Sequence, residues 1–303
     1  MTYYCGLDGG GSKTHLCITD ENGVIVAEKI FGPINISGTS AETVKDTIGS
    51  CIDFMKSLPC GTENCKGVVI GVAGISNKSG TKFIKDTLKQ EGYSGNLYLT
   101  GDNEIALAGA INGHGAVLIA GTGSICFGRD ENGKSFRCGG HGYLIDDEGS
   151  GYAIGRDILI AVTQTYDGRA PETCLTEAVY NQLKVTDQSE ITTWIYSPQT
   201  EKKQIAALAP LLIPALEQND EAAKQIAEKA VKALTHLAVS ACKKSNSESG
   251  ELALLGSIFT HYAYIKEKVV SSIKAELPQI KIVEPRYSAA QGAANLAREL
   301  FTT

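Results

Sequence analysis

Short apolar runs separated by glycine-rich turns open the chain. Tyr3–Leu7 is predicted to be a strand, and His15–Thr19 is predicted to return beside it as a second strand. The segment Asp20–Gly23 reads Asp-Glu-Asn-Gly, and Asn-Gly is a strong signal for a hairpin turn. With Val24–Ile30 as a third strand, these segments predict an antiparallel meander at the start of the chain.

The same pattern recurs 110 residues further along the chain. Gly115–Ile119 is an apolar run that enters a turn of glycine and hydroxyl residues, and Ile125–Gly128 leaves that turn. Asp130–Gly133 then repeats the four letters Asp-Glu-Asn-Gly. A unit repeated at one fixed offset predicts two related domains that begin with the same hairpin.

Between and after these hairpins, helical and strand patterns alternate, which predicts an α/β fold with mixed sheets. Thr39–Glu42 resembles a capping box, and apolar residues at helical spacing follow it. We expect domains at 1–112 and 113–303, with the final helix packing back on the first domain. Helices are expected at 151–165, 172–184, 203–217, 220–244 and 289–301, and strands at 67–72, 96–100, 252–255 and 280–283.

The composition excludes several classes of protein. Hydrophobic residues make up 43% of the 303 residues and charged residues 20%, which are globular values that exclude wholesale disorder. The net charge is −6 and no basic tract is present, so nucleic-acid binding is disfavoured. The longest apolar runs are far shorter than the ~20 residues of a membrane-spanning helix, and no signal peptide is visible. We therefore expect a cytoplasmic protein that binds neither nucleic acid nor membranes.

Cysteine usage agrees with that compartment. The nine cysteines are an odd number in a long chain without a secretion signal, so we expect reduced thiols. Cys60 and Cys65 form a close pair, but their spacing lacks the Cys/His pattern of a zinc site. We interpret them as two thiols in a loop.

The first glycine-rich turn, Asp8–Thr14, resembles a P-loop only superficially. That motif needs a lysine directly after its second glycine and a helix behind it, whereas Ser12 follows Gly11 and a strand pattern comes next. Two readings remain. The turn is either an ordinary hairpin with a solvated aspartate, or a loop whose N–H groups approach phosphate oxygens while Asp8, at the end of an apolar strand, holds Mg²⁺.

A second turn of the same kind, Gly121-Thr122-Gly123-Ser124, occupies the matching place in the second hairpin. Two such turns on related hairpins can face each other and hold one phosphate chain from both sides. The pair is more specific than either turn alone, so we predict a phosphate-binding site made of both.

Asp102 follows the predicted strand that ends at residue 100, and it opens a helix. An aspartate at such a position is commonly an N-cap, whose carboxylate accepts hydrogen bonds from the first turn of the helix. Alternatively, a carboxylate beside bound phosphates can act as the general base that takes the proton of an attacking alcohol. The residues alone favour the cap and leave the base open.

Two further segments combine glycine with polar residues. The segment 139–151 places Asp146, Asp147 and Glu148 between glycines just before a helix. Sugar hydroxyls are natural partners for such acids, and the alternative is an acidic first turn that complements the helix dipole. In Leu252–Ser257 a strand leads into Gly256 at a helix start, where a base or ribose can approach the backbone. By itself this last signal is weak.

Together these segments resemble the sugar kinase–Hsp70–actin superfamily, and within it the N-acetylglucosamine kinase group of BadF-type ATPases. The resemblance spans the whole chain. It implies two ribonuclease-H-like domains of the actin-like ATPase type, with a nucleotide cleft between them, and an ATP-dependent kinase that phosphorylates an amino sugar at the 6-hydroxyl. The motifs that carry it are Asp-Gly-Gly-Gly-Ser from residue 8, Pro-Ile-Asn at 33–35, Thr-Gly-Asp at 100–102, Ile-Ala-Gly-Thr-Gly-Ser at 119–124, Cys-Gly-Gly-His-Gly at 138–142, Asp-Glu-Gly-Ser-Gly at 147–151, Leu-Leu-Gly-Ser at 254–257 and Ser-Ala-Ala-Gln-Gly-Ala at 288–293.

The resemblance also implies roles for individual residues. Asp102 resembles the catalytic base, in contact with the sugar, and Asp8 resembles the acid that organises Mg²⁺, here through water. The expected cofactors are ATP and Mg²⁺, and the expected assembly is a homodimer. The residues implied to contact ATP are Gly10, Gly11, Ser12, Lys13, Thr14, Gly121, Thr122, Gly123, Gly256 and Ser257. The other residues implied to contact the sugar are Asn35, Gly139, Gly140, His141, Asp147 and Glu148.

The chain departs from the family pattern beside the sugar-binding segment. It has His141 where the family often has tryptophan, and Asp146 where the family often has glycine. These differences predict an altered sugar preference, for example acceptance of a 3-O-lactyl group as in N-acetylmuramic acid kinases.

Two other functions are kept as alternatives on the same fold. An ATPase activator of a dehydratase or reductase would need cysteines for an iron–sulfur cluster, and no cluster-type motif surrounds Cys126 or Cys138. A non-catalytic sugar sensor would be expected to lose the base, and Asp102 is present. The sequence therefore favours the kinase.

Overall fold

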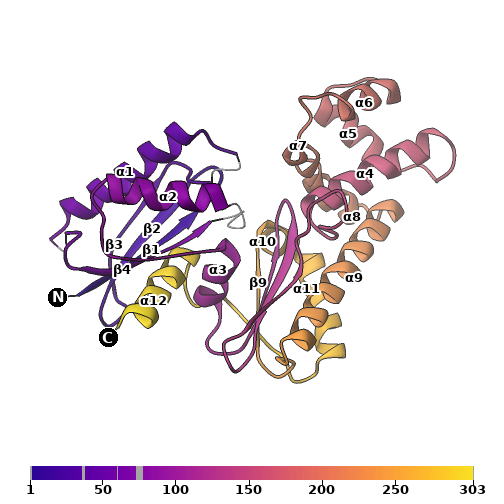
Figure 1. The fold of residues 1–303 in the computed structure, drawn as a ribbon. Coiled ribbons are helices and arrows are strands. Elements are labelled where there is room, and N and C mark those ends of the chain that lie inside the picture. The colour runs from indigo at the N-terminus through magenta and orange to yellow at the C-terminus, as the bar shows by residue number, and fades with distance from the viewer. Residues whose placement is uncertain (1, 36–37, 60, 73–77, 303) are drawn as a thin grey trace. The chain divides into compact units, whose positions relative to one another are not determined.

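The computed structural model describes residues 2–35, 38–59, 61–72 and 78–302. The chain forms two compact units (Figure 1). Unit 1 comprises Met1–Asn112 and Glu284–Thr303, and unit 2 comprises Gly113–Val283. The end of the chain therefore returns to the unit in which the chain begins. Within the described residues, no helix is both long and apolar enough to cross a lipid bilayer.

Unit 1 is built on a five-stranded mixed sheet with the order β3-β2-β1-β4-β5. The strands β1, β2 and β3 form an antiparallel meander, whereas β4 and β5 run parallel to β1. The helices α1 and α2 lie on one face of the sheet, and α3 and α12 lie on the other (Figure 1). The elements are β1 (Tyr3–Gly9), β2 (Thr14–Asp20), β3 (Ile25–Phe31), α1 (Ala41–Ser57), β4 (Cys65–Val72), α2 (Lys78–Gln90), β5 (Asn96–Thr100), α3 (Asp102–Ala110) and α12 (Ala289–Phe301).

Alternate residues of β1 serve the two faces of this sheet, as the two-residue period of a strand requires. Cys5 and Leu7 belong to the buried cluster beneath α1, whereas Tyr4 belongs to a smaller cluster beneath α12. On the α12 face, Gly6 lets the helix come very close, because a Cβ built there would lie 2.1 Å from a backbone oxygen of α12. The strand is therefore held firmly from both sides.

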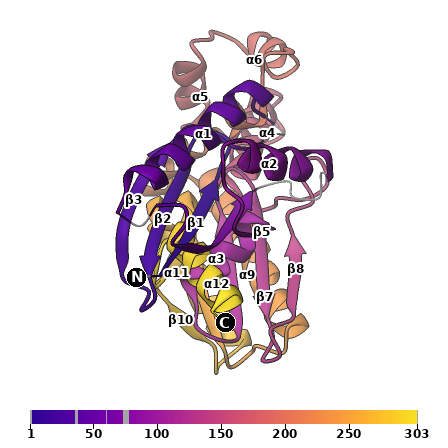
Figure 2. The same cartoon turned by 60° about the vertical axis from the view of Figure 1, so that its left-hand side comes forward.

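Unit 2 repeats this plan with a sheet of order β10-β9-β6-β7-β8. Here β6, β7 and β8 form the antiparallel meander, and β9 and β10 run parallel to β6. Figure 2 shows β8 at one edge of the sheet. The strands are β6 (Gly115–Ala120), β7 (Ser124–Arg129), β8 (Ser135–Gly139), β9 (Glu251–Leu255) and β10 (Lys281–Val283).

The two Asp-Glu-Asn-Gly turns have the same hydrogen bonds. Asp20 Oδ1 accepts bonds from the backbone N–H groups two and four residues further on, both at 2.9 Å. Asp130 Oδ1 accepts the equivalent bonds at 2.9 and 2.8 Å. The repeated hairpin predicted from the sequence is therefore present in both sheets.

The helices of unit 2 differ in part from the predicted ones. The single helix expected over 203–217 is wrong, since the chain there forms α7, a short 3₁₀ turn η1 and α8, with Pro210 inside η1. The strand β8 and the helix α6 were not expected. The helical elements are α4 (Gly151–Tyr166), α5 (Leu175–Leu183), α6 (Gln188–Ile195), α7 (Lys202–Ala206), η1 (Ala209–Leu211), α8 (Leu212–Glu217), α9 (Glu221–Lys244), α10 (Ser257–His261) and α11 (Ala263–Glu276).

Two local predictions concern the start of α1 and the cysteines. The capping box expected at Thr39–Glu42 is wrong, because the N-cap of α1 is Ser40, whose side chain accepts from the N–H of Thr43 at 3.2 Å. The eight cysteines in the part of the chain that is described, Cys65 among them, are not joined in disulfides. Cys60 lies outside the described residues.

Candidate functional site

The turn between β1 and β2 is the first predicted phosphate loop. The Gly10 N–H donates to the Lys13 carbonyl at 2.9 Å and closes the turn, while Gly11, Ser12 and Lys13 are exposed. Thr14 is different, because its side chain is fully buried at the start of β2 and its hydroxyl has no hydrogen-bond partner among the described residues. The loop thus offers its backbone and Lys13 to a ligand, and the contact of Thr14 with phosphate stays a prediction.

Asp8 lies one residue before the end of β1 and is half-buried. Burial raises the pKa of Asp8 and the negative charge of Asp102 raises it further, whereas the charges of His15 and Lys13 lower it. Asp8 and Asp102 therefore interact electrostatically. This agrees with the sheet, in which β1, β4 and β5 run parallel and end at the same edge.

Asp102 is the first residue of α3, and Gly101 is the N-cap. The alternative in which Asp102 itself is the N-cap is therefore wrong. Its carboxylate is exposed, and Oδ1 accepts a hydrogen bond from the N–H of Asn103 at 3.0 Å. An exposed carboxylate at the junction of a strand and a helix is accessible to a substrate.

Mg²⁺ is usually held by one or two carboxylates together with phosphate oxygens and water. Asp8 and Asp102 supply two such carboxylates next to the first loop, so the residues present fit this ion. Over the described residues, no group of three or more His, Cys, Asp or Glu side chains is placed to hold a metal. A bound Mg²⁺ would therefore depend on phosphate oxygens or water for its other ligands.

Asn35 lies in the loop after β3, and this loop comes back to the first glycine turn. The Asn35 N–H donates to the carbonyl of Gly10 at 3.3 Å. The preceding Ile34 is completely buried and lies against Gly9, where a Cβ would be 2.4 Å from its side chain. Unit 1 therefore places the predicted sugar ligand Asn35 beside its own phosphate loop.

The second glycine turn, between β6 and β7, is closed by a hydrogen bond from the Gly121 N–H to the Gly123 carbonyl at 2.9 Å. The start of α4 is bound to the same turn, because the Gly151 N–H donates to the Gly121 carbonyl at 2.7 Å. Ser124 also joins it to the acidic turn 146–148, since its hydroxyl donates to the Glu148 carbonyl at 2.8 Å. The phosphate loop and the predicted sugar-binding turn of unit 2 are thus one connected structure.

Asp147 is buried, and its backbone is left-handed with φ of 64°. Its Oδ1 accepts from the Ser124 N–H at 3.2 Å, and its Oδ2 pairs with the Lys202 ammonium at 2.6 Å. Lys202 comes from α7, and nothing in the sequence marked it. Glu148 is paired in a similar way with Arg156 of α4, at 3.1 Å.

Glycines set the path of the backbone between β8 and the acidic turn. Gly139, the last residue of β8, and Gly140, which follows it, have φ values of 70° and 72°. His141 is exposed, and its backbone N–H donates to Asp146 Oδ2 at 2.9 Å. Asp146, which the family often replaces with glycine, therefore fixes the backbone on which His141 is carried.

Gly256 connects β9 to α10 and approaches the end of β6. Its φ is 99°, and a Cβ there would lie 2.3 Å from the Ala120 carbonyl oxygen, so this position requires glycine. A cavity of about 360 Å³ adjoins it, lined by Gly121 and Thr122 of the second loop and by Ser257. Unit 2 therefore brings the predicted adenosine contact and the second phosphate loop to one cavity of a size suited to a small ligand.

Comparisons with known proteins agree with these features. An N-acetylmuramic acid/N-acetylglucosamine kinase from Clostridium acetobutylicum is 33% identical over 303 residues, covering 98% of this chain and 99% of the relative. An N-acetyl-D-glucosamine kinase from Dictyostelium discoideum is 29% identical over 309 residues, covering 97% of each chain.

Solved structures show the same fold. A protein from Chromobacterium violaceum, provisionally named an N-acetylglucosamine kinase, matches with a TM-score of 0.76 and 23% identity over 98% of this chain and 99% of that one. A ROK family glucokinase from Streptomyces griseus, in complex with glucose and AMPPNP, matches with a TM-score of 0.60 and 16% identity over 98% and 99%. The predicted fold class is therefore confirmed.

The family model of the BadF/BadG/BcrA/BcrD ATPases matches residues 5–297, which include both glycine turns, Asp102 and the acidic turn. The resemblance inferred from the sequence motifs is thereby confirmed. The chain belongs to the BadF/BadG/BcrA/BcrD ATPase family.

Proposed function

We propose that the protein is an ATP-dependent kinase that transfers the γ-phosphoryl group of ATP to the 6-hydroxyl of an amino sugar. The observation that carries the proposal is that Asp8, near the end of β1, and Asp102, directly after β5, lie at the same edge of the unit 1 sheet as the first glycine turn. It is supported by relatives named as kinases of N-acetylglucosamine and N-acetylmuramic acid. N-acetylglucosamine is the proposed substrate, with N-acetylmuramic acid and glucosamine as further candidates.

In the proposed reaction, Asp102 accepts the proton of the 6-hydroxyl while the sugar oxygen attacks the γ-phosphorus. The bond from the γ-phosphorus to the β–γ bridging oxygen breaks, and ADP leaves with that electron pair. The N–H groups of residues 10–12 and 121–123 stabilise the negative charge of the phosphates. Asp8 would hold Mg²⁺, which supplies positive charge beside the β- and γ-phosphates when it is bound.

The sugar is proposed to lie against the loop of Asn35 and the turn 139–148. Asn35 and Asp147 would bind ring hydroxyls, with Gly139, Gly140, His141 and Glu148 beside them. The base of the nucleotide would enter the cavity next to Gly256 and Ser257. Each of these groups is polar or leaves the backbone open, as recognition of a sugar and a nucleotide requires.

A substrate panel tests the proposal directly. ADP release would be coupled to NADH oxidation, with N-acetylglucosamine, glucosamine, N-acetylmuramic acid and glucose as acceptors, and the product would be identified by mass spectrometry and NMR. We expect ADP and a sugar 6-phosphate in equal amounts, with an amino sugar preferred over glucose. ADP release that does not depend on any sugar would instead favour an ATPase activator, and sugar binding without turnover would favour a sensor.

We also propose that the protein is a cytoplasmic homodimer, on the strength of the family resemblance. Light scattering on the purified protein measures the mass of the assembly against 32.1 kDa for one chain. A monomer at micromolar concentration would contradict the proposed dimer and leave the catalytic proposal untouched.

His141 is predicted to set tolerance for a substituent on the 3-hydroxyl. It is exposed on the turn beside Asp146 and is smaller than the tryptophan common in the family. His141→Trp should therefore lower kcat/KM for N-acetylmuramic acid relative to N-acetylglucosamine by about tenfold, the effect of ~1.4 kcal/mol. If the ratio of the two values is unchanged, His141 does not shape that side of the site.

Asp8→Asn is expected to raise the stability of the fold at neutral pH while it weakens the Mg²⁺-dependent activity. Because the folded protein raises the pKa of Asp8, the ionised carboxylate destabilises the fold at neutral pH, and this penalty disappears as the pH falls below the unfolded pKa of about 3.9. Asp8→Asn should therefore have a higher Tm than the wild type at pH 7 and a smaller advantage near pH 4. Meanwhile, the Mg²⁺ concentration for half-maximal activity should rise by about 10–100-fold.

The matched control is Asp53→Asn on α1, whose carboxylate is 79% exposed. This change should leave both the Tm difference and the Mg²⁺ dependence nearly unaltered. A lower Tm for Asp8→Asn at pH 7, with no recovery at acid pH, would show that the Asp8 carboxylate stabilises the fold and would contradict the prediction.

A further inference from the structure

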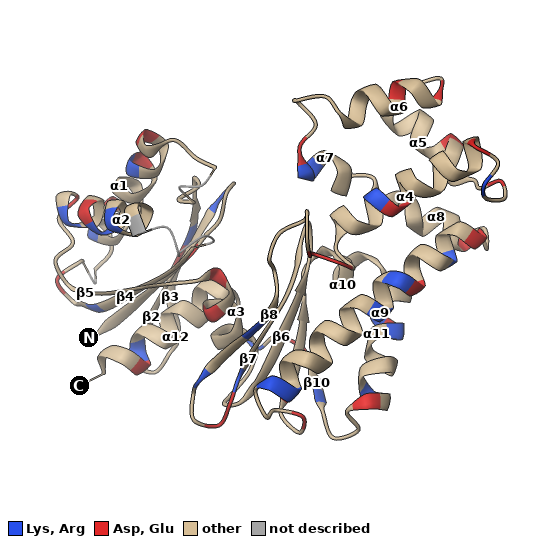
Figure 3. Cartoon of the chain, turned by 45° about the vertical axis from the view of Figure 1, so that its right-hand side comes forward, with Lys and Arg blue, Asp and Glu red and all other residues tan. Residues whose placement is uncertain are grey.

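Lys202 is a partly buried lysine to which the proposed mechanism gives no role. It stands at the start of α7, where Figure 3 shows blue and red segments together, and its ammonium lies 2.6 Å from Asp147 Oδ2. The Lys202 side chain is 28% exposed and that of Asp147 is 5% exposed. The Asp147 carboxylate is almost inaccessible to solvent and lies 55 residues from Lys202 in the sequence. The ion pair therefore fixes the position of the lysine side chain.

The backbone conformation of Asp147 indicates that this residue is held in place by its contacts. A residue with a Cβ rarely adopts a left-handed φ such as 64°, and it persists there only when its surroundings hold it. The side chain has two such restraints, the Ser124 N–H at Oδ1 and the Lys202 ammonium at Oδ2. Lys202 is therefore one of the groups that fix where the carboxylate points.

The same cation touches the second phosphate loop. A Cβ built on Gly123 would lie 2.9 Å from Asp147 Oδ2 and 3.0 Å from the Lys202 Nζ. The ammonium also lies 5.6 Å from the ring centre of Tyr143, in the turn that precedes Asp147. Loop, carboxylate and ammonium thus meet at one point of unit 2.

We propose that Lys202 is a positioning residue that sets the affinity of the sugar site by orienting Asp147. This rests on the proposed role of Asp147 as a sugar ligand. An ionised carboxylate has about four acceptor positions, and the two restraints use one on each oxygen. The remaining positions keep a fixed direction toward the hydroxyls of the sugar, which must donate to them.

The helix that carries Lys202 is held independently of this ion pair. A capping box closes the start of α7, with the Glu201 N–H donating to Gln204 Oε1 at 2.6 Å. Further along, Ala206 lines the cavity proposed for the nucleotide. Loss of the Lys202 charge should therefore disturb the sugar ligand and leave the wall of the nucleotide cavity in place.

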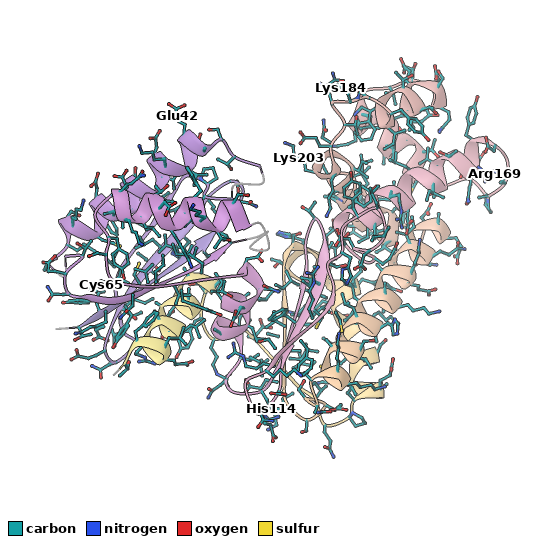
Figure 4. The ribbon with its side chains drawn as sticks, in the orientation of Figure 1. Glu42, Cys65, His114, Arg169, Lys184 and Lys203 are labelled. Carbon is teal, nitrogen blue, oxygen red and sulfur yellow. The ribbon has the colours of Figure 1, made fainter. Side chains whose placement is uncertain are left out.

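The test compares Lys202→Met and Lys202→Arg with a matched control, Lys203→Met, in the full-length protein. Lys203, labelled in Figure 4, is next in sequence, but its side chain is 76% exposed and pairs with Glu201 on the surface. For each variant, kcat and the KM values for N-acetylglucosamine and ATP are measured, with the Kd of N-acetylglucosamine from calorimetry without nucleotide and the Tm.

We expect Lys202→Met to raise the KM and the Kd of the sugar by at least about tenfold, the effect of leaving one buried group without its partner. The KM for ATP should stay within about twofold, Lys202→Arg should restore most of the sugar affinity, and Lys203→Met should behave as the wild type. An unchanged sugar Kd in Lys202→Met would overturn the proposal. Equal losses for sugar and ATP, with a lower Tm and no rescue by arginine, would overturn it as well, because they would indicate a general structural role.

Measurements on the wild type distinguish a failure of the Lys202 proposal from a failure of the proposed kinase function. If the wild type phosphorylates an amino sugar and Lys202→Met keeps its sugar affinity, the positioning role of Lys202 is refuted and the kinase proposal stands. If the wild type neither binds nor phosphorylates any amino sugar of the panel, the proposed function itself is refuted.

Discussion

Asp102→Asn is expected to lower turnover by about 10²–10⁴-fold, the usual effect of losing a general base. The amide has nearly the same shape as the carboxylate but cannot take the proton of the attacking hydroxyl. Turnover is measured by ADP release with saturating amino sugar, and binding of a non-hydrolysable ATP analogue is measured by calorimetry. The Kd of the analogue should change little, because the groups proposed to hold the phosphates are the backbone N–H groups of residues 10–12 and 121–123, which this substitution leaves in place.

The structure makes this substitution a clean test. Gly101, and not Asp102, is the N-cap of α3, and the oxygen of an asparagine side chain can still accept the hydrogen bond of the Asn103 N–H. The helix should therefore form as in the wild type, with an unchanged Tm. Turnover close to that of the wild type would mean that Asp102 only supports the start of the helix.

The hairpins were predictable from the sequence because their signals are local. In each Asp-Glu-Asn-Gly turn, the aspartate binds backbone N–H groups two and four residues away, so the four letters are nearly sufficient to define the turn. The same holds for α12, where Ser288 caps the helix by accepting from the Gln291 N–H at 3.2 Å. Its observed bounds, Ala289–Phe301, are those expected from the sequence.

Other elements could not be predicted from local sequence signals. The apolar spacing over 203–217 fits one helix, but Pro210 has no N–H for an α-helical bond and the chain breaks there into α7, η1 and α8. The edge strand β8 is short and only partly buried, so its residues lack a clear apolar pattern. The first error arises because a proline interrupts an otherwise helical spacing, and the second because a half-exposed edge strand carries no apolar pattern.

In the candidate site, too, some features could be predicted from the sequence and others could not. The positions of Asp8 and Asp102 follow from parallel strands that end at one edge of a sheet. The alternation of helical and strand patterns predicts a mixed sheet of this kind. The ion pair of Asp147 with Lys202 joins residues 55 positions apart, and neither segment carries a motif for it. Pairings of this kind depend on the packing of α7 against α4 and could be found only in the folded structure.

Gly6→Ala is expected to destabilise the protein by about 3 kcal/mol or more, at the upper end of the effects of overpacking. A Cβ at this position in β1 would lie 2.1 Å from the Ala290 oxygen, 2.2 Å from the Ala294 nitrogen and 2.8 Å from the Ala293 carbonyl carbon. All three are backbone atoms of α12, so no change of rotamer can make room. The strand and the helix must move apart, and the cluster of Tyr4 beneath α12 is opened.

The control for Gly6→Ala is Gly38→Ala, where no described residue other than its chain neighbours lies within 4 Å of the added Cβ. Thermal unfolding of both variants should show Tm lowered by roughly 5–10 °C for Gly6→Ala and nearly unchanged for Gly38→Ala. Because Asp8 follows Gly6 by two residues in the same strand, turnover should fall in Gly6→Ala even well below its Tm. A wild-type Tm for Gly6→Ala would mean that α12 does not pack on β1 at this distance, and the rigid support inferred for Asp8 would have to be abandoned.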